Sequence, residues 1–342
     1  MARPKPQRMT PPAKPAAPSA ARPAKGRTNR GRSGNPARAA VAPTAHRGPL
    51  TWRDWVGGAR LRTLPLAISP VALGTGAGVV AASYLDEPFH PWRFVLALVV
   101  ALALQIGVNY ANDYSDGIRG TDAHRVGPAR LTGSGLVAPK RVLAVALAFF
   151  AIAAVAGLAL VVITQQWWLL AVGAVAIVAA WFYTGGKRPY GYYGLGELFV
   201  FVFFGLVATA GSAYVQALTV NLEAWTGGAG VGLIACAVLM ANNLRDIDQD
   251  RAAGKRTLSV LVGKLASRIL FAVFMLLPFG VVVFWAFLYP PAWLVLFALL
   301  AAIPACIIVG WSRTPRELIL ALQLASFTSL AYGIGLGLVF AL

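Results

Sequence analysis

Long apolar runs recur along the chain from residue 64 to its end, with short polar segments between them. Each run is about 20 residues long, which is the length a helix needs to cross the hydrocarbon core of a bilayer. The pattern predicts nine spanning helices, over residues 64–85, 93–113, 142–163, 167–184, 195–218, 228–246, 269–289, 292–311 and 318–342. We therefore expect an all-α fold, a polytopic membrane bundle of nine transmembrane helices.

The polar segments differ in charge in a way that orients this bundle. If the N-terminus is inside, the inner loops and the helix ends beside them carry fifteen lysines and arginines, whereas the outer loops carry only Arg93. Cytoplasmic loops of membrane proteins are enriched in these residues. We expect a cytoplasmic N-terminus, a C-terminus outside, and lid loops that cover the cytoplasmic end of the bundle.

Composition agrees with a membrane protein and separates a tail from the bundle. The chain is 58% hydrophobic and 12% charged, whereas about a quarter of the residues in soluble domains are charged. Residues 1–50 hold 11 of the 30 basic residues and no acidic residue, so the net charge of +18 is largely a property of this segment. We expect a disordered basic Pro/Ala-rich cytoplasmic tail at 1–50 and a transmembrane domain at 51–342, and no nucleic-acid partner. The tail either lies on anionic lipid or has no specific role.

Carboxylates gather at the inner ends of two predicted helices, together with asparagines. The first stripe has i, i+3, i+4 and i+7 spacing and consists of Asn109, Asn112, Asp113 and Asp116. The second has i, i+3 and i+7 spacing and consists of Asn243, Asp246 and Asp250. Helical geometry places each set on one face, where like charges repel. A divalent cation relieves this repulsion, and oxygen ligands without His or Cys favour Mg²⁺. The alternative is a pair of solvated helix ends that pair with neighbouring arginines.

Basic residues surround these stripes, as expected for a phosphate-binding site. They are Arg119, Lys187, Arg245 and Lys255. Glycine-rich loops at 131–136 and 184–187 bring backbone amides within reach of an anion, but neither has the spacing of a P-loop. A diphosphate site with an apolar bundle behind it predicts a substrate with a diphosphate head and a lipid tail.

These residues resemble the UbiA superfamily of intramembrane aromatic prenyltransferases, and within it the branch that acts on 1,4-dihydroxy-2-naphthoate. The similarity covers about residues 55–342. It is carried by A-R-L-R-T-L-P-L (59–66), N-D-Y-S-D-G-I-R-G-T-D (112–122), Y-T-G-G-K-R-P-Y-G-Y-Y-G-L-G-E (183–197) and N-N-L-R-D-I-D-Q-D-R-A-A-G-K-R-T-L (242–258).

The match to the family motifs has one departure. The first motif, Asn-x3-Asp-x3-Asp, fits Asn109 and Asp113, but its third position is Gly117 and Asp116 stands one residue early. Whether Asp116 or Asp122 is a direct metal ligand is therefore open. The second motif matches at Asp246 and Asp250, and the Tyr-x3-Lys element matches at Tyr183 and Lys187.

The resemblance implies a reaction at the membrane of a bacterial cell. A polyprenyl group would pass from polyprenyl diphosphate to 1,4-dihydroxy-2-naphthoate with loss of CO₂ and diphosphate, giving demethylmenaquinol for menaquinone biosynthesis. Two Mg²⁺ ions would bind, one at each stripe. The implied catalytic residues are Asp113, Asp246, Lys187 and Tyr183, and the candidates for acceptor binding are Arg62, Asn112 and Tyr190.

Several alternatives remain open from the sequence. Arg62 equally fits a marker of the inner membrane boundary, and Tyr183 and Tyr190 fit an interfacial aromatic belt. A prenyltransferase of the same family could use another aromatic or polar acceptor. A transporter would also place carboxylates on membrane helices, but near the midplane rather than at helix ends.

Overall fold

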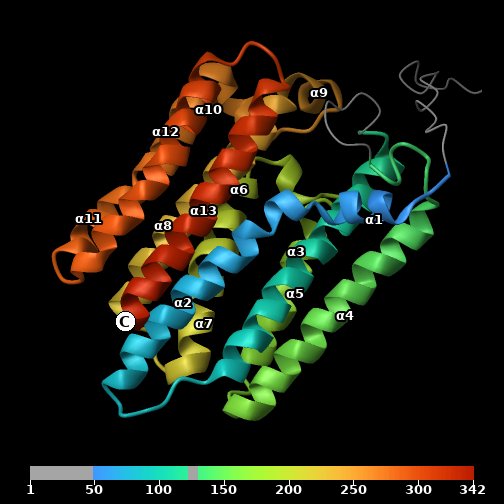
Figure 1. The fold of residues 1–342 in the computed structure, drawn as a ribbon. Coiled ribbons are helices and arrows are strands. Elements are labelled where there is room, and N and C mark those ends of the chain that lie inside the picture. The colour runs from blue at the N-terminus through green and yellow to red at the C-terminus, as the bar shows by residue number, and fades with distance from the viewer. Residues whose placement is uncertain (1–48, 122–129) are drawn as a thin grey trace, which may run out of the picture. The chain divides into compact units, whose positions relative to one another are not determined.

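The computed structural model describes residues 49–121 and 130–342. These residues form helices joined by short loops, with no strand among them, and the long helices lie side by side (Figure 1). Eight helical segments are long and apolar enough to cross a membrane. They are α2 (Pro65–Ser83), α3 (Pro91–Arg119), α4 (Pro139–Thr164), α6 to α7 (Gly196–Ala217), α8 (Leu222–Arg245), α10 to α11 (Leu258–Ala286), η5 with α12 (Pro290–Trp311) and α13 (Glu317–Ala341).

The predicted all-α membrane bundle is confirmed, with a difference in one helix. The segment predicted over 167–184 is the shorter helix α5, Leu169–Phe182. Its 14 residues span about 21 Å at 1.5 Å per residue, against about 30 Å for a typical bilayer core. The helix ends early because the chain turns at Thr184 and Gly185 before Gly186, which has a φ of 74°.

Two spans contain interruptions that the apolar pattern does not predict. Between α6 (Gly196–Val200) and α7 (Ala208–Ala217) the chain forms the π-helical segment η4, Phe201–Val207. Within it Gly205 packs so tightly that a Cβ there would lie 2.6 Å from Gly232 Cα of α8. The span of α10 (Leu258–Leu276) and α11 (Pro278–Ala286) is interrupted twice: Gly263 inside α10 leaves helical geometry with a φ of 84°, and Pro278 begins a new helix after α10.

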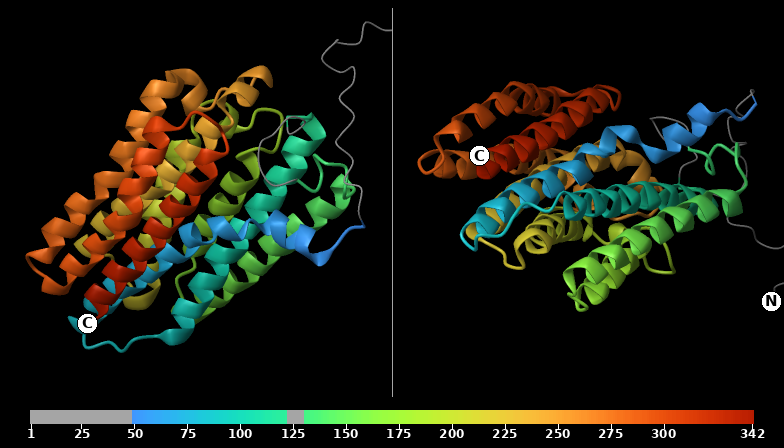
Figure 2. Two further views of the ribbon diagram at one scale, coloured as in Figure 1. Left: turned by 45° about the horizontal axis from the view of Figure 1, so that its top comes forward. Right: turned by 60° about the horizontal axis from the view of Figure 1, so that its bottom comes forward.

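The centre of the bundle is packed through small residues. α2 packs against α13 and α7, and α3 packs along α4; Figure 2 gives two further views of this arrangement. A Cβ at Gly76 of α2 would lie 1.9 Å from the backbone oxygen of Gly337 in α13. Such close approach of backbones is how membrane helices gain packing energy without a hydrophobic drive between them.

Short elements gather at the end of the bundle where α3 and α8 terminate. They are α1 (Trp52–Ala59), η2 (Leu61–Thr63), η3 (Tyr190–Tyr192) and α9 (Ile247–Ala252) (Figure 1). The loop at residues 130–138 lies at the same end. The polar segments that were predicted to form the cytoplasmic lid therefore lie together at this end of the bundle.

Candidate active site

A cavity of about 260 Å³ lies between α2, α3, α5, α8 and the segment from α6 to α7. Its polar part contains both Asn/Asp stripes, namely Asn109, Asn112, Asp113, Asp116, Asn243, Asp246 and Asp250. Its apolar part is lined by side chains such as Leu66, Leu104, Val108, Phe199, Phe203 and Val238. The cavity thus joins a carboxylate-rich mouth to a hydrophobic interior.

The first stripe lies on an unbroken helix, because α3 continues to Arg119 and ends at Gly120, which has a φ of 74°. Asp113 accepts hydrogen bonds from two backbone amides of the glycine-rich loop, Leu131 N–H to Oδ2 at 2.9 Å and Thr132 N–H to Oδ1 at 2.8 Å. Thr132 also packs on Gly117, where a Cβ would lie 2.4 Å from Thr132 Cγ2. Because the loop packs against α3 at this point, there is no room for a side chain at Gly117, the third position of the motif.

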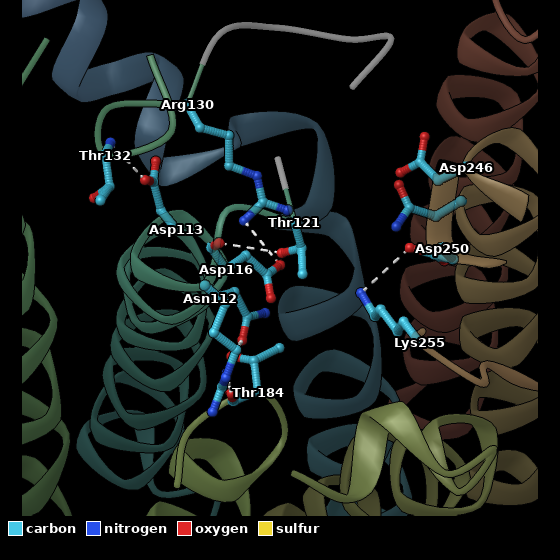
Figure 3. Close-up of polar contacts among 12 residues, drawn as sticks. Asn112, Asp113, Asp116, Thr121, Arg130, Thr132, Thr184, Asp246, Asp250 and Lys255 are labelled. Atoms are coloured by element: carbon cyan, nitrogen blue, oxygen red, sulfur yellow. Dashed lines mark hydrogen bonds and ion pairs between the residues drawn. The ribbon is translucent and has the colours of Figure 1, made fainter. Parts of the chain in front are cut away.

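Asp116 is held by residues from two other segments, and Figure 3 shows one of them, Arg130. Tyr192 Oη donates a hydrogen bond to Asp116 Oδ1 at 2.7 Å, and Arg130 Nη1 lies 3.4 Å from Asp116 Oδ2. Burial raises the pKa of Tyr192, and the negative charge of Asp116 raises it further. The ring of Tyr192 also has the Arg119 and Lys255 cations over it, at 5.4 and 5.0 Å from the ring centroid. Tyr192 therefore connects the α3 stripe to the segment after α8.

The second stripe is interrupted by a helix end. α8 stops at Arg245, Asp246 has non-helical angles (φ −97°, ψ 6°), and α9 starts at Ile247. Asp250 nevertheless keeps the helical register, because its N–H donates to Asp246 O at 2.8 Å. The expectation that Asp246 and Asp250 share a face is met by this junction rather than by a continuous helix.

The carboxylates of the second stripe are paired with basic side chains close by in sequence. Arg245 donates from Nε and Nη2 to the two oxygens of Asp246 at 2.7 and 2.6 Å. Lys255 Nζ lies 3.7 Å from Asp250 Oδ1. Burial raises the pKa of Asp250 to about 6; Lys255 opposes this shift, while Asp246 and Asp116 add to it. The two stripes therefore interact electrostatically within one site.

The donor set fits Mg²⁺ that shares its ligands with a substrate. Over the described ranges, no three His, Cys, Asp or Glu side chains lie close enough to hold an ion by themselves. Mg²⁺ is commonly bound by one or two carboxylates with phosphate oxygens and water completing the shell. Asn109 uses its amide hydrogens on Ala59 O and Thr63 Oγ1, so its Oδ1 remains as an oxygen ligand.

The remaining predicted residues divide into those that line the cavity and those that do not. Arg62, Asn112, Tyr183, Tyr190, Arg245 and Lys255 line it. Lys187 is exposed and lies outside the lining. Arg119 is also exposed, and donates to the backbone oxygens of Thr184 and Gly186. Asp122 lies outside the described residues.

Aromatic and basic side chains border the acceptor candidates. Tyr190 contacts the ring of Tyr183 edge-on with centroids 5.5 Å apart, and stacks on Phe199 at 3.9 Å. Burial lowers the pKa of Arg62, and the charges of Arg245 and Arg130 lower it further, whereas Asp246 raises it. Arg62 of η2 therefore lies within electrostatic range of Arg245, Asp246 and Arg130.

The sequence pattern did not indicate several residues that line the cavity, including Arg60, Thr63, Gln105, Arg130 and Gln249. Gln105 precedes Asn109 by four residues, so helical spacing alone extends the first stripe to it. Arg130 directly precedes the loop that Asp113 holds. Its position could be inferred only after that loop was known to fold onto α3.

Comparisons with known proteins give three findings. The UbiA prenyltransferase family profile matches residues 70–339. The 1,4-dihydroxy-2-naphthoate octaprenyltransferase of Mycobacterium tuberculosis is 53% identical over 221 residues, which are 65% of this chain and 74% of that protein. Two solved structures are similar in fold. The apo UbiA homolog from Aeropyrum pernix K1 has a TM-score of 0.61 at 17% identity over 80% of this chain and 96% of its own. The homolog from Archaeoglobus fulgidus bound to DMAPP and Mg²⁺ has a TM-score of 0.55 at 15% identity, over 83% and 98%.

Proposed function

Because the chain belongs to the UbiA prenyltransferase family, we infer that the cavity between α3 and α8 is a prenyl-transfer active site. The protein is a magnesium-dependent polyprenyltransferase of menaquinone biosynthesis. It transfers a polyprenyl group from polyprenyl diphosphate to 1,4-dihydroxy-2-naphthoate, with release of CO₂ and diphosphate. The observation that carries this conclusion is the pair of Asn/Asp stripes at the mouth of an apolar cavity, in a chain 53% identical to a naphthoate octaprenyltransferase.

A direct assay tests this function. Purified protein is incubated with Mg²⁺, a polyprenyl diphosphate and a set of aromatic acids that includes 1,4-dihydroxy-2-naphthoate and 4-hydroxybenzoate. We expect demethylmenaquinol and CO₂ to form from the naphthoate. Turnover of 4-hydroxybenzoate in preference to the naphthoate would contradict the assignment.

We propose that two Mg²⁺ ions bind, one at each stripe. The first would be held by Asn109, Asp113 and Asp116, and the second by Asp246 and Asp250. When bound, the ions neutralise the diphosphate as the allylic C–O bond breaks. The all-oxygen donor set at each stripe supports this proposal, since carboxylates close together repel one another and favour a cation between them.

The other side chains of the site have separable proposed roles. Arg245 and Lys255 hold the charge of the departing diphosphate. The apolar interior keeps water from the allylic cation, and the ring faces of Tyr183 and Tyr190 stabilise it. Arg62 binds the acceptor carboxylate, and Asn112 contributes to the acceptor site. Lys187 and Arg119 act at the outer edge, where Arg119 holds the turn at Thr184.

The protein is a multi-pass membrane protein, and we propose its orientation from the charge of its loops. The site would face the cytoplasm of a bacterial cell, with the N-terminus inside and the C-terminus outside. Single cysteine substitutions at the exposed residues Lys140 and Glu87 test this orientation. An impermeant maleimide should label the cysteine at position 140 only in inverted vesicles.

We also propose that residues 51–342 form the catalytic domain. Deletion of residues 1–50 should then leave turnover unchanged.

A further inference from the structure

Gln105 is a buried polar residue of the cavity for which the mechanism above has no use. It lies on α3 one helical turn before Asn109, on the side of the apolar interior, and it is 5% exposed. Its Nε2 donates a hydrogen bond to Thr63 Oγ1 at 2.8 Å. Its Oε1 is buried and has no hydrogen-bond partner among the residues that the structure describes. Leaving a buried acceptor without a partner is unfavourable, so a ligand that donates a hydrogen bond to it would bind more tightly.

The hydrogen bonds of Thr63 fix the orientation of the Gln105 amide. Thr63 has one hydroxyl hydrogen, which it donates to Arg60 O at 2.9 Å. Its oxygen can then only accept, and it does so from Gln105 Nε2 and from Asn109 Nδ2, the latter at 3.1 Å. A reversed Gln105 amide would place two acceptors against each other. The amide nitrogen of Gln105 is therefore the end at Thr63, and its oxygen is the end without a partner among the described residues.

The reactants differ in whether they can donate to this acceptor. The polyprenyl chain has no N–H or O–H group, and an ionised diphosphate only accepts. The aromatic acceptor has two hydroxyls. The hydroxyl beside the carboxylate bonds internally to that carboxylate, so the hydroxyl at C4 is the one without a partner.

We propose that Gln105 Oε1 accepts a hydrogen bond from the C4 hydroxyl of 1,4-dihydroxy-2-naphthoate, and so is a specificity-determining residue for the acceptor. This rests on the proposed function of the cavity. Arg62 is adjacent in sequence to Thr63 and lines the same cavity, so carboxylate and C4 hydroxyl are recognised from one wall. Gln105 lies about 6 Å deeper along α3 than Asn109, which directs the ring toward the apolar interior.

Two acceptor analogues and one substitution test the contact. The substitution is Gln105→Met, which keeps the length of the side chain and removes the acceptor. We expect the KM for 1,4-dihydroxy-2-naphthoate to rise about ten- to a hundredfold, and the KM for polyprenyl diphosphate to stay the same. The competitive Ki of 4-hydroxy-2-naphthoate should rise by a similar factor. The Ki of 1-hydroxy-2-naphthoate, which lacks the C4 hydroxyl, should not change.

Controls separate this contact from a loss of structure. Gln216→Met removes another buried glutamine, which bonds to the backbone of His90 outside the cavity, and should leave the acceptor KM unchanged. Thr63→Val releases the Gln105 amide, and should reduce the discrimination between the two analogues even if Gln105→Met does not fold. Thr63→Ser keeps the hydroxyl and should preserve the discrimination.

The proposal is overturned if Gln105→Met raises the Ki of 1-hydroxy-2-naphthoate as much as that of 4-hydroxy-2-naphthoate, because the residue would then act only through packing. Failure of the proposed function has a different signature: the wild-type protein would not turn over 1,4-dihydroxy-2-naphthoate. Binding of the two analogues, measured by calorimetry on the wild-type protein and Gln105→Met, would still test Gln105 in that case.

Discussion

The two Asn/Asp stripes have nearly the same spacing in sequence, but the fold holds them in different ways. On α3 the carboxylates bind groups from distant segments: Asp113 holds the backbone of Leu131 and Thr132, and Asp116 binds Tyr192. At the junction of α8 and α9 the carboxylates bind basic side chains from their own segment, since Asp246 pairs with Arg245 and Asp250 with Lys255.

This difference gives the α3 stripe a structural role in addition to its proposed role in metal binding. The α3 stripe fastens the loop over the mouth of the cavity, so its removal should alter structure as well as chemistry. At the junction of α8 and α9, Arg245 and Lys255 pair with the carboxylates. A bound diphosphate can replace the carboxylates as the partner of these two cations. Two similar motifs need not therefore have the same role, and substitutions at four positions test how far the roles differ.

The largest expected effect is that of Asp246→Asn. Because one preorganised electrostatic contact to developing charge is worth up to about 10³-fold, we expect kcat to fall on the order of 10³-fold. The loop at residues 131–136 should keep its protection from hydrogen exchange, since Asp113 is untouched. Near-normal turnover at saturating Mg²⁺ would contradict a metal role for the junction.

Asp113→Asn should have a smaller kinetic effect and a larger structural one. The amide keeps a single acceptor oxygen for two backbone N–H groups, so Leu131 N–H or Thr132 N–H loses its partner. We expect about 10²-fold lower kcat together with faster exchange of both amides, measured by mass spectrometry. If exchange in the loop is unchanged, Asp113 is not its anchor and the two stripes are equivalent after all.

Arg62→Ala should weaken binding of the acceptor, because Arg62 lines the cavity and is proposed to bind the acceptor carboxylate. Loss of a charge-assisted contact predicts an acceptor KM about ten- to a hundredfold higher, with little change in the donor KM. Arg62→Lys should recover little, because an ammonium cannot replace a bidentate guanidinium. An unchanged acceptor KM would leave Arg62 as a marker of the membrane boundary.

Asp248→Asn should have the smallest effect and serves as the matched control for Asp246 and Asp250. The Asp248 side chain is 69% exposed and pairs with Lys264 at 2.8 Å and Arg251 at 3.9 Å. Exposed ion pairs are worth about 0–1 kcal/mol. We expect turnover and thermal stability within twofold and a few degrees of wild type. A large loss of activity would mean that substitutions of Asp246 and Asp250 act by lowering the negative charge of this segment, and not through the position of those carboxylates in the site.

The length of the apolar runs predicted the bundle, and the spacing of polar residues predicted the two stripes, because spacing along a helix fixes which side chains share a face. The spacing did not predict the break at Asp246, since apolar and polar positions keep the same register on both sides of it. The position of Lys187 also lay beyond the sequence pattern. It depends on the turn at Gly185 and Gly186, which Arg119 holds from α3, and no local pattern specifies such a long-range contact.

The shortness of α5 links the enzyme to the thickness of its membrane. At about 21 Å the helix falls about 9 Å short of a typical hydrocarbon core, and it begins beside Trp167 and Trp168, which are exposed and suited to the headgroup level. Hydrophobic mismatch of this kind costs fractions of a kcal/mol per Å and is relieved by local thinning of the bilayer. Ala176, Ala179 and Ala180 of the same helix line the cavity. We therefore expect the geometry of this active site to respond to the acyl-chain length of the surrounding lipid.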